Sequence, residues 1–243
     1  MGVVFNNEVP ILAYRTQGKS NSFILYAPIV GCSLFIILTS FAMLFYPGGI
    51  KINPSTQGYD LFMNFFSDLG RTVSHSGSVN TISFVLFVIA LLISGISFCI
   101  FFNFLPKYLP QNSFTELYGN KIRITGIISG LAIIMIAFTP ADVIQLFHDL
   151  TVLIAFTFIL LTSLGLMWIT FKSKEFHSIY SISYLILIAL ILIYGIIGLF
   201  FFQVNTNEGL FLRVTAQKMV VYFLSICYVI QSIGFIKFQH RKK

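Results

Sequence analysis

A carboxylate, a guanidinium and an imidazole lie within eleven positions of this chain, in the stretch FFSDLGRTVSH at residues 65–75. The groups belong to Asp68, Arg71 and His75, and Ser67 lies directly before the carboxylate. Only 9% of the 243 residues are charged, so this concentration is unusual for the chain. Charged groups gather either to bind or transform a ligand, or to hold the backbone through caps and ion pairs.

A second polar stretch, FTPADVIQLFHDL at residues 138–150, carries Asp142, His148 and Asp149. Pro140 is expected to end one helix there, because proline lacks the N–H that a continuing helix needs. The connection to the next helix is short, so Asp142 and His148 must lie close to that helix end. We therefore expect the two stretches to meet at one end of the fold.

Zinc is one ion that these side chains could hold. Histidine and aspartate are suitable zinc ligands, and three of them with a bound water would form a hydrolytic centre. The chain has no H-E-x-x-H motif and no paired-cysteine spacing, so we predict no metal and no other cofactor. A hydrolase that uses Asp68, Asp142 and His148, with or without metal, stays open as an alternative, and the sequence does not decide whether the protein is an enzyme.

A purely structural role for the same residues needs no ligand. Asp142 suits the start of a short helix opened by Pro140, where a carboxylate caps free N–H groups. Asp68 and Arg71 are three positions apart and could pair on one helix face. Either arrangement would account for part of the cluster without binding or catalysis.

Long apolar segments must position both stretches. The chain is 57% hydrophobic with a mean hydropathy of +0.89, which does not suit a soluble domain. About 20 apolar residues cross roughly 30 Å of hydrocarbon as a helix, and a helix satisfies its own backbone N–H and C=O groups where lipid cannot. The sequence therefore predicts an all-α membrane protein, a polytopic bundle of six transmembrane helices. The spans are residues 23–46, 81–104, 124–139, 150–171, 179–202 and 219–236.

The distribution of charge indicates the orientation of the bundle. With six spans both termini lie on one side, and that side carries eleven of the fifteen Lys and Arg residues. Because cytoplasmic segments are rich in Lys and Arg, we expect a multi-pass protein of the cell membrane with cytoplasmic N- and C-termini. The chain divides into a cytoplasmic segment 1–22, a six-span domain 23–237 and a basic cytoplasmic tail 238–243. The net charge of +7 then reflects topology rather than nucleic-acid binding.

The first outer segment, residues 47–80, is the longest connection, and a connection of this length usually has a function or structure of its own. Within YDLFMNFFSDLGR, residues 59–71, apolar residues recur at helical spacing, while Asp60, Asn64 and Asp68 share another face. This pattern predicts an amphipathic helical segment. Its apolar face would lie on the lipid interface or on the bundle, and its polar face would line water or a cavity.

The basic residues of the outer side suggest a ligand. Arg71, with Arg213 and Lys218 from the last outer loop, could receive a phosphate or carboxylate headgroup that Asp68 and His148 orient. Proton coupling is less favoured, because the spans contain almost no charge. We therefore expect membrane lipids as partners and binding of a lipid or small amphiphile at an outer-face polar pocket. The predicted ligand-binding residues are Ser67, Asp68, Arg71, His75, Asp142, His148, Asp149 and Arg213.

The stretch GIISG, residues 126–130, is a G-x-x-x-G pattern that lets two helices approach closely. Ordinary packing within one chain is its expected use. The pattern does not establish association between chains, so no oligomeric state is predicted.

The stretches FFSDLG and AFTPADVIQLFHDL resemble motifs of the prokaryotic multi-span family catalogued as domain of unknown function number 998. That family is expected to carry S-[DE]-L-G in the first outer loop, and G-x-F-P-x-D followed by a histidine at the next span. The matching residues here are Ser67, Asp68, Leu69 and Gly70, then Phe138, Pro140, Asp142 and His148, with Thr139 inserted. The chain is also distantly similar to the FRAG/DRAM group of six-span proteins, some of which act in lipid remodelling or autophagy. The resemblance covers roughly residues 23–171 and implies architecture rather than an activity.

Overall fold

Six long helices form the protein, and all six are long and apolar enough to cross a membrane. The computed structural model describes residues 22–200 and 204–241. Most of the predicted cytoplasmic segment 1–22, with Arg15 and Lys19, lies outside the described residues, as do the last two lysines. The predicted all-α, six-span membrane bundle is confirmed.

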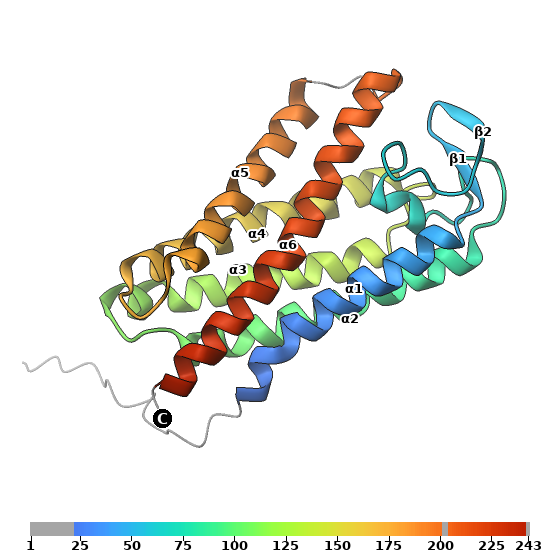
Figure 1. Ribbon diagram of the computed structural model, residues 1–243. Coiled ribbons are helices and arrows are strands. Elements are labelled where there is room, and N and C mark those ends of the chain that lie inside the picture. The colour runs from blue at the N-terminus through green and yellow to red at the C-terminus, as the bar shows by residue number, and fades with distance from the viewer. Residues whose placement is uncertain (1–21, 201–203, 242–243) are drawn as a thin grey trace, which may run out of the picture.

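The connection after the first helix is much longer than the others. They are α1 (Ala27–Leu44), α2 (Thr81–Phe104), α3 (Ser113–Ala137), α4 (Gln145–Lys172), α5 (Ser178–Phe200) and α6 (Asn207–Arg241). Two 3-10 helices extend the spans, η1 (Ser22–Tyr26) before α1 and η3 (Leu105–Tyr108) after α2. Each helix packs against the next in sequence, and α6 returns to pack against α1, which closes the bundle (Figure 1).

The helix boundaries agree with the predicted spans where the helix and the apolar segment begin and end at the same residues. Residues 81–104 were predicted as a span and form α2. Helix α3 begins earlier than the predicted span 124–139, because Asn112 caps it: the Asn112 side chain accepts from Thr115 N at 2.9 Å, and Thr115 Oγ1 accepts from Asn112 N at 3.0 Å. Helix α6 begins at Asn207, before the predicted span 219–236, and continues to Arg241, into the predicted tail.

The G-x-x-x-G pattern is used within the chain. A Cβ atom at Gly130 would lie 2.9 Å from the carbonyl oxygen of Gly95 on α2, and one at Gly126 would overlap the ring of Phe102. The two glycines therefore allow α3 and α2 to approach closely, as expected for packing inside one bundle. Around this contact the interior is filled by buried aromatic rings, including Phe98, Phe101 and Tyr228.

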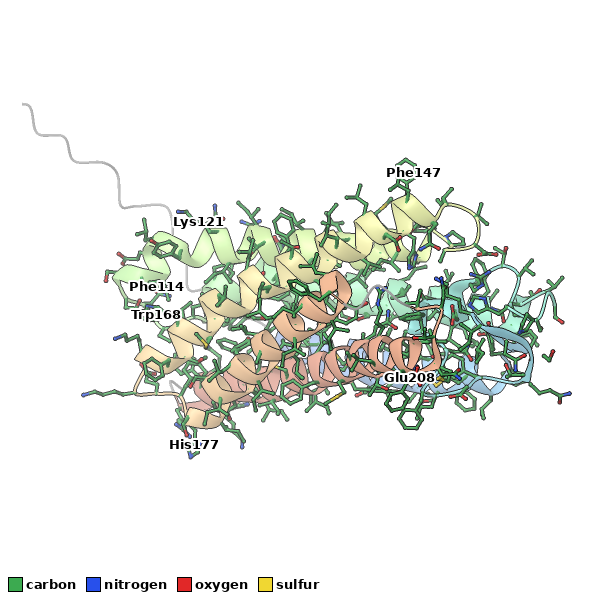
Figure 2. All side chains as sticks on the ribbon, turned by 90° about the horizontal axis from the view of Figure 1, so that it is seen from above. Phe114, Lys121, Phe147, Trp168, His177 and Glu208 are labelled. Carbon is green, nitrogen blue, oxygen red and sulfur yellow. The ribbon has the colours of Figure 1, made fainter. Side chains whose placement is uncertain are left out.

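The bundle has two distinct ends. The described ends of the chain lie together at one end, here called the terminal end, and the long connection between α1 and α2 lies at the other, here called the loop end (Figure 1). In the view from above, Phe114, Trp168 and His177 lie at the terminal end, whereas Glu208 lies toward the loop end (Figure 2). The two predicted polar stretches both belong to the loop end.

The connection between α1 and α2, residues 45–80, is called loop 1. It contains a hairpin of strands β1 (Gly48–Ile50) and β2 (Asn53–Gln57), which pair antiparallel, followed by the 3-10 helix η2 (Phe66–Gly70). Gly49 has a φ of +84° and approaches the backbone of His75 and Ser76 so closely that a Cβ atom would not fit. The hairpin is thereby held against the segment that precedes α2.

The predicted amphipathic helix at 59–71 is not one continuous helix. Asp60 Oδ1 accepts from the backbone N–H of Phe62 at 2.8 Å and of Met63 at 3.1 Å, which makes a turn, and Phe65 is extended. Side chains of Asp and Asn that bond nearby backbone groups compete with helix formation. A turn and the five-residue η2 therefore replace the helix, while Phe66 and Leu69 still face the bundle and are buried.

Candidate functional site

Asp68 lies on η2 and is buried, with 5% of its surface exposed. Its Oδ1 lies 3.0 Å from His75 Nε2, and its Oδ2 accepts from Asn64 Nδ2 at 3.1 Å and from the backbone N–H of Phe65 at 2.9 Å. The carboxylate therefore pairs with the imidazole of His75. The alternative pairing with Arg71 is not the one that forms, since Arg71 Nε donates to the carbonyl of Val73 at 3.1 Å.

Two tyrosines surround this pair. The hydroxyl of Tyr46 accepts from the backbone N–H of His75 at 3.2 Å, and the hydroxyl of Tyr59 donates to the carbonyls of Asn64 and Phe65 at 3.1 and 3.0 Å. Burial raises the pKa of Tyr46 to about 12 and raises that of Tyr59 well above its ordinary value. Both hydroxyls are therefore neutral at physiological pH and serve as hydrogen-bonding groups.

Asp142 connects the second polar stretch to loop 1. Its carboxylate accepts from Thr72 N at 3.0 Å, from Thr72 Oγ1 at 2.6 Å and from Val73 N at 2.9 Å. Partial burial would raise the pKa of Asp142, but these hydrogen bonds outweigh it and hold the pKa below its ordinary value. The two stretches therefore meet, and they do so through a carboxylate that holds loop backbone.

His148 and Asp149 take partners within their own stretch. His148, buried near the start of α4, places Nδ1 2.7 Å from the carbonyl oxygen of Thr139, and because a carbonyl only accepts, Nδ1 donates. This bond closes the turn between α3 and α4. Asp149 is exposed and accepts from Gln145 Nε2 at 2.8 Å. No hydrogen bond in the described residues joins either side chain to Asp68.

The remaining predicted residues lie around this centre. Ser67 is half-buried on η2. Arg213 is half-buried on α6, within electrostatic range of Tyr194 on α5. Within residues 22–200 and 204–241, no three His, Cys, Asp or Glu side chains are arranged to hold a metal ion. The zinc alternative thus has no ligand set in that part of the chain.

Lys218 occupies a position that its sequence context did not predict. It lies on α6 rather than in a loop and is 5% exposed. Its Nζ donates to the carbonyl of Asn64 and lies 5.1 Å from the ring centroid of Tyr59 and 5.8 Å from that of Phe66. Its neighbour Gln217 accepts from the backbone N–H of Phe66 at 2.9 Å. Helix α6 therefore fastens the segment that carries Asp68.

An open groove of about 360 Å³ lies beside Lys218. Loop 1 contributes Leu61 and Phe62 to its wall, α5 contributes Leu190, and α6 contributes Thr215, Lys218, Met219, Tyr222, Phe223 and Ile226. The volume is within the range of small-molecule sites, and the lining is mostly apolar with few polar groups, as such sites usually are. A smaller cavity of about 90 Å³ lies inside the bundle, where Cys32, Ser94 and Ser225 are its polar lining.

Comparisons with protein-family models, with curated proteins and with solved structures find no match. The resemblance to the multi-span family with the S-[DE]-L-G motif therefore stays a prediction. The site is interpreted from its own geometry.

Proposed function

We propose that this protein binds a lipid or a small amphiphile at its loop end. The observation that carries the proposal is the groove between loop 1, α5 and α6, which is open and mostly apolar and has its few polar lining residues, Thr215, Lys218 and Tyr222, on α6. An amphiphile needs this combination, because its chain must lie on apolar side chains while its headgroup meets hydrogen-bonding groups.

The apolar rim of the groove supports this assignment. Leu61 and Phe62 of loop 1 are 44% and 50% exposed, and the Phe62 ring lies 5.8 Å from the ring of Phe211 on α6. Exposed apolar side chains on a loop are costly in water but not in contact with an acyl chain. The charge distribution predicts cytoplasmic termini, so the loop end would face outward and the ligand would come from the outer leaflet.

Filling the groove tests the proposal. Thr215→Phe would place a ring in the groove from its α6 wall, and we expect the purified protein to lose the lipid that the wild type retains through detergent washing. Native mass spectrometry measures the retained lipid directly. Thr157→Phe is the matched control, because Thr157 is exposed on α4 and lies outside both cavities. Equal retention by the wild type and Thr215→Phe would contradict the proposal.

A second candidate function is hydrolysis of a membrane ester by the pair of Asp68 and His75. A buried carboxylate that orients an imidazole is the arrangement that a general base requires. This candidate uses His75 in place of His148, which is engaged with the carbonyl of Thr139. Asp68→Asn should then abolish release of fatty acid from a phospholipid ester by the purified protein. Absence of release by the wild type would rule the candidate out.

A further inference from the structure

We propose that the groove selects lipids with an anionic headgroup and that Lys218 is the residue that binds this headgroup. The inference rests on the proposed function, because it names the chemical class of ligand that the same groove would take. It is carried by the burial of Lys218, by its few compensating contacts and by its place in the groove wall.

Lys218 is a buried cation in an apolar wall. Its side chain is 5% exposed, and its ammonium lies over the rings of Tyr59 and Phe66. Removing an ammonium from water carries a large desolvation penalty, which is offset only when an opposite charge and several hydrogen bonds replace the water. Contact with two aromatic faces offsets part of this penalty.

The protein compensates the charge incompletely. An ammonium has three donors, and among the described residues Nζ makes one hydrogen bond, to the carbonyl of Asn64. No carboxylate in that part of the chain forms an ion pair with it within 4.0 Å.

Two carboxylates act on Lys218 from further away, and both have other partners. They are Asp68 and Asp60. Asp68 is bonded to His75, Asn64 and Phe65, and Asp60 is bonded to the backbone of loop 1. A phosphate or carboxylate headgroup in the groove would supply the close negative charge that Lys218 lacks.

The depth of Lys218 fits a headgroup. Lys218 and Lys237 are nineteen residues apart on α6, which corresponds to about 29 Å along a helix and is close to the hydrocarbon thickness of a bilayer. With Lys237 at the interface of the terminal end, Lys218 lies near the interface of the loop end, where lipid headgroups are.

The groove can distinguish one lipid from another by the charge of the headgroup rather than by the acyl chain. An acyl chain gains little by leaving the bilayer for an apolar groove, because lipid tails are as apolar as the groove lining. Preference for one lipid over another must therefore come from polar contacts. Both kinds of phospholipid carry a phosphate, but the cationic group of a zwitterionic headgroup would be repelled by the buried ammonium of Lys218, so an anionic lipid should be favoured by roughly tenfold or more.

The test compares lipids that share acyl chains and differ in headgroup. The full-length protein is offered phosphatidylglycerol, phosphatidylcholine or diacylglycerol, and native mass spectrometry measures what each variant retains. We expect the wild type to prefer phosphatidylglycerol over phosphatidylcholine by about tenfold. Lys218→Met should reduce this ratio to near one, and Lys218→Arg should restore most of it. Lys51→Met is the matched control, since Lys51 is an exposed lysine of loop 1 outside the groove and its loss should leave the ratio unchanged.

Each outcome separates this inference from the proposed function. Equal retention of anionic and zwitterionic lipid by the wild type would overturn the inference, with no variant needed, and would leave amphiphile binding intact. A preference that survives in Lys218→Met would assign the selectivity to another residue and also overturn it. Retention of no lipid by the wild type would overturn the proposed function itself. Displacement of phosphatidylglycerol by inorganic phosphate alone would show that the site recognises the anion irrespective of the lipid that carries it, and would overturn the assignment of a lipid as its specific ligand.

Discussion

At the scale of single residues, Asp142 has the clearest role. Its carboxylate accepts from Thr72 N, Thr72 Oγ1 and Val73 N, which belong to a segment seventy positions earlier in the chain. Carboxylates that accept several hydrogen bonds favour the charged form, which explains the lowered pKa of Asp142. Asp142 therefore joins loop 1 to the connection between α3 and α4.

Replacing Asp142 should loosen this connection. Asp142→Asn keeps the shape but removes the charge and one acceptor oxygen, so we expect a loss of roughly 1–3 kcal/mol of stability at neutral pH. Because the pKa is lowered on folding, the carboxylate stabilises the protein above its unfolded-state pKa, near 4, and this contribution is lost as pH falls through the folded-state value. Thermal unfolding in detergent at several pH values measures both effects.

A matched control is available on the same stretch. Asp149 is exposed and its side chain accepts a single hydrogen bond, from Gln145, so Asp149→Asn should change the unfolding temperature little. Wild type and Asp142→Asn should converge at acid pH, where both lack the charge. An unfolding temperature of Asp142→Asn equal to that of the wild type at neutral pH would show that the contact with Thr72 contributes nothing.

At the scale of elements, α6 and loop 1 show where hydropathy stops being informative. Hydropathy detected only residues 219–236, whereas α6 runs from Asn207 to Arg241. The additional first turns bring Gln217 and Lys218 to the backbone of loop 1, at Phe66 and Asn64. A polar helical turn next to a span has no hydrophobic signal, so its helical conformation and its contacts could be identified only from the tertiary structure.

Loop 1 departs from its predicted helix because its polar side chains bond to backbone. Asp60 makes a turn, and Asn80 Nδ2 donates to the carbonyls of Leu69 and Arg71 at 3.1 and 2.9 Å. The spacing of apolar residues correctly predicted which side chains are buried, since Phe66 and Leu69 are buried. The spacing could not reveal the hydrogen bonds that compete with helix formation. Burial was thus predictable here and backbone conformation was not.

At the scale of the whole molecule, the proposed function depends on how the bundle is oriented in the membrane. Among the residues that the structure describes, the terminal end carries seven of the eleven Lys and Arg residues, which predicts that this end is cytoplasmic. The proposed binding of an outer-leaflet lipid depends on this orientation, because the groove lies at the loop end.

Cysteine labelling of intact cells tests the orientation. Ser78→Cys places an exposed thiol on loop 1, and we expect a membrane-impermeant maleimide to label it without permeabilisation. Glu175→Cys, exposed between α4 and α5, should react only after permeabilisation. The native Cys32, Cys99 and Cys227 lie within spans and should contribute little background. The reverse labelling pattern would invert the bundle and move the proposed lipid to the cytoplasmic leaflet.

Hydropathy was sufficient to locate six helical spans, because lipid forces each crossing segment to be apolar and to satisfy its own backbone hydrogen bonds. It also placed both polar stretches at one end. The partner of each polar side chain could be identified only from the tertiary structure. Asp68 pairs with His75 rather than with Arg71, and Asp142 accepts hydrogen bonds from Thr72 rather than capping a helix. Such choices depend on distances between segments far apart in the chain, and so does the burial of Lys218 beside a groove built from three elements.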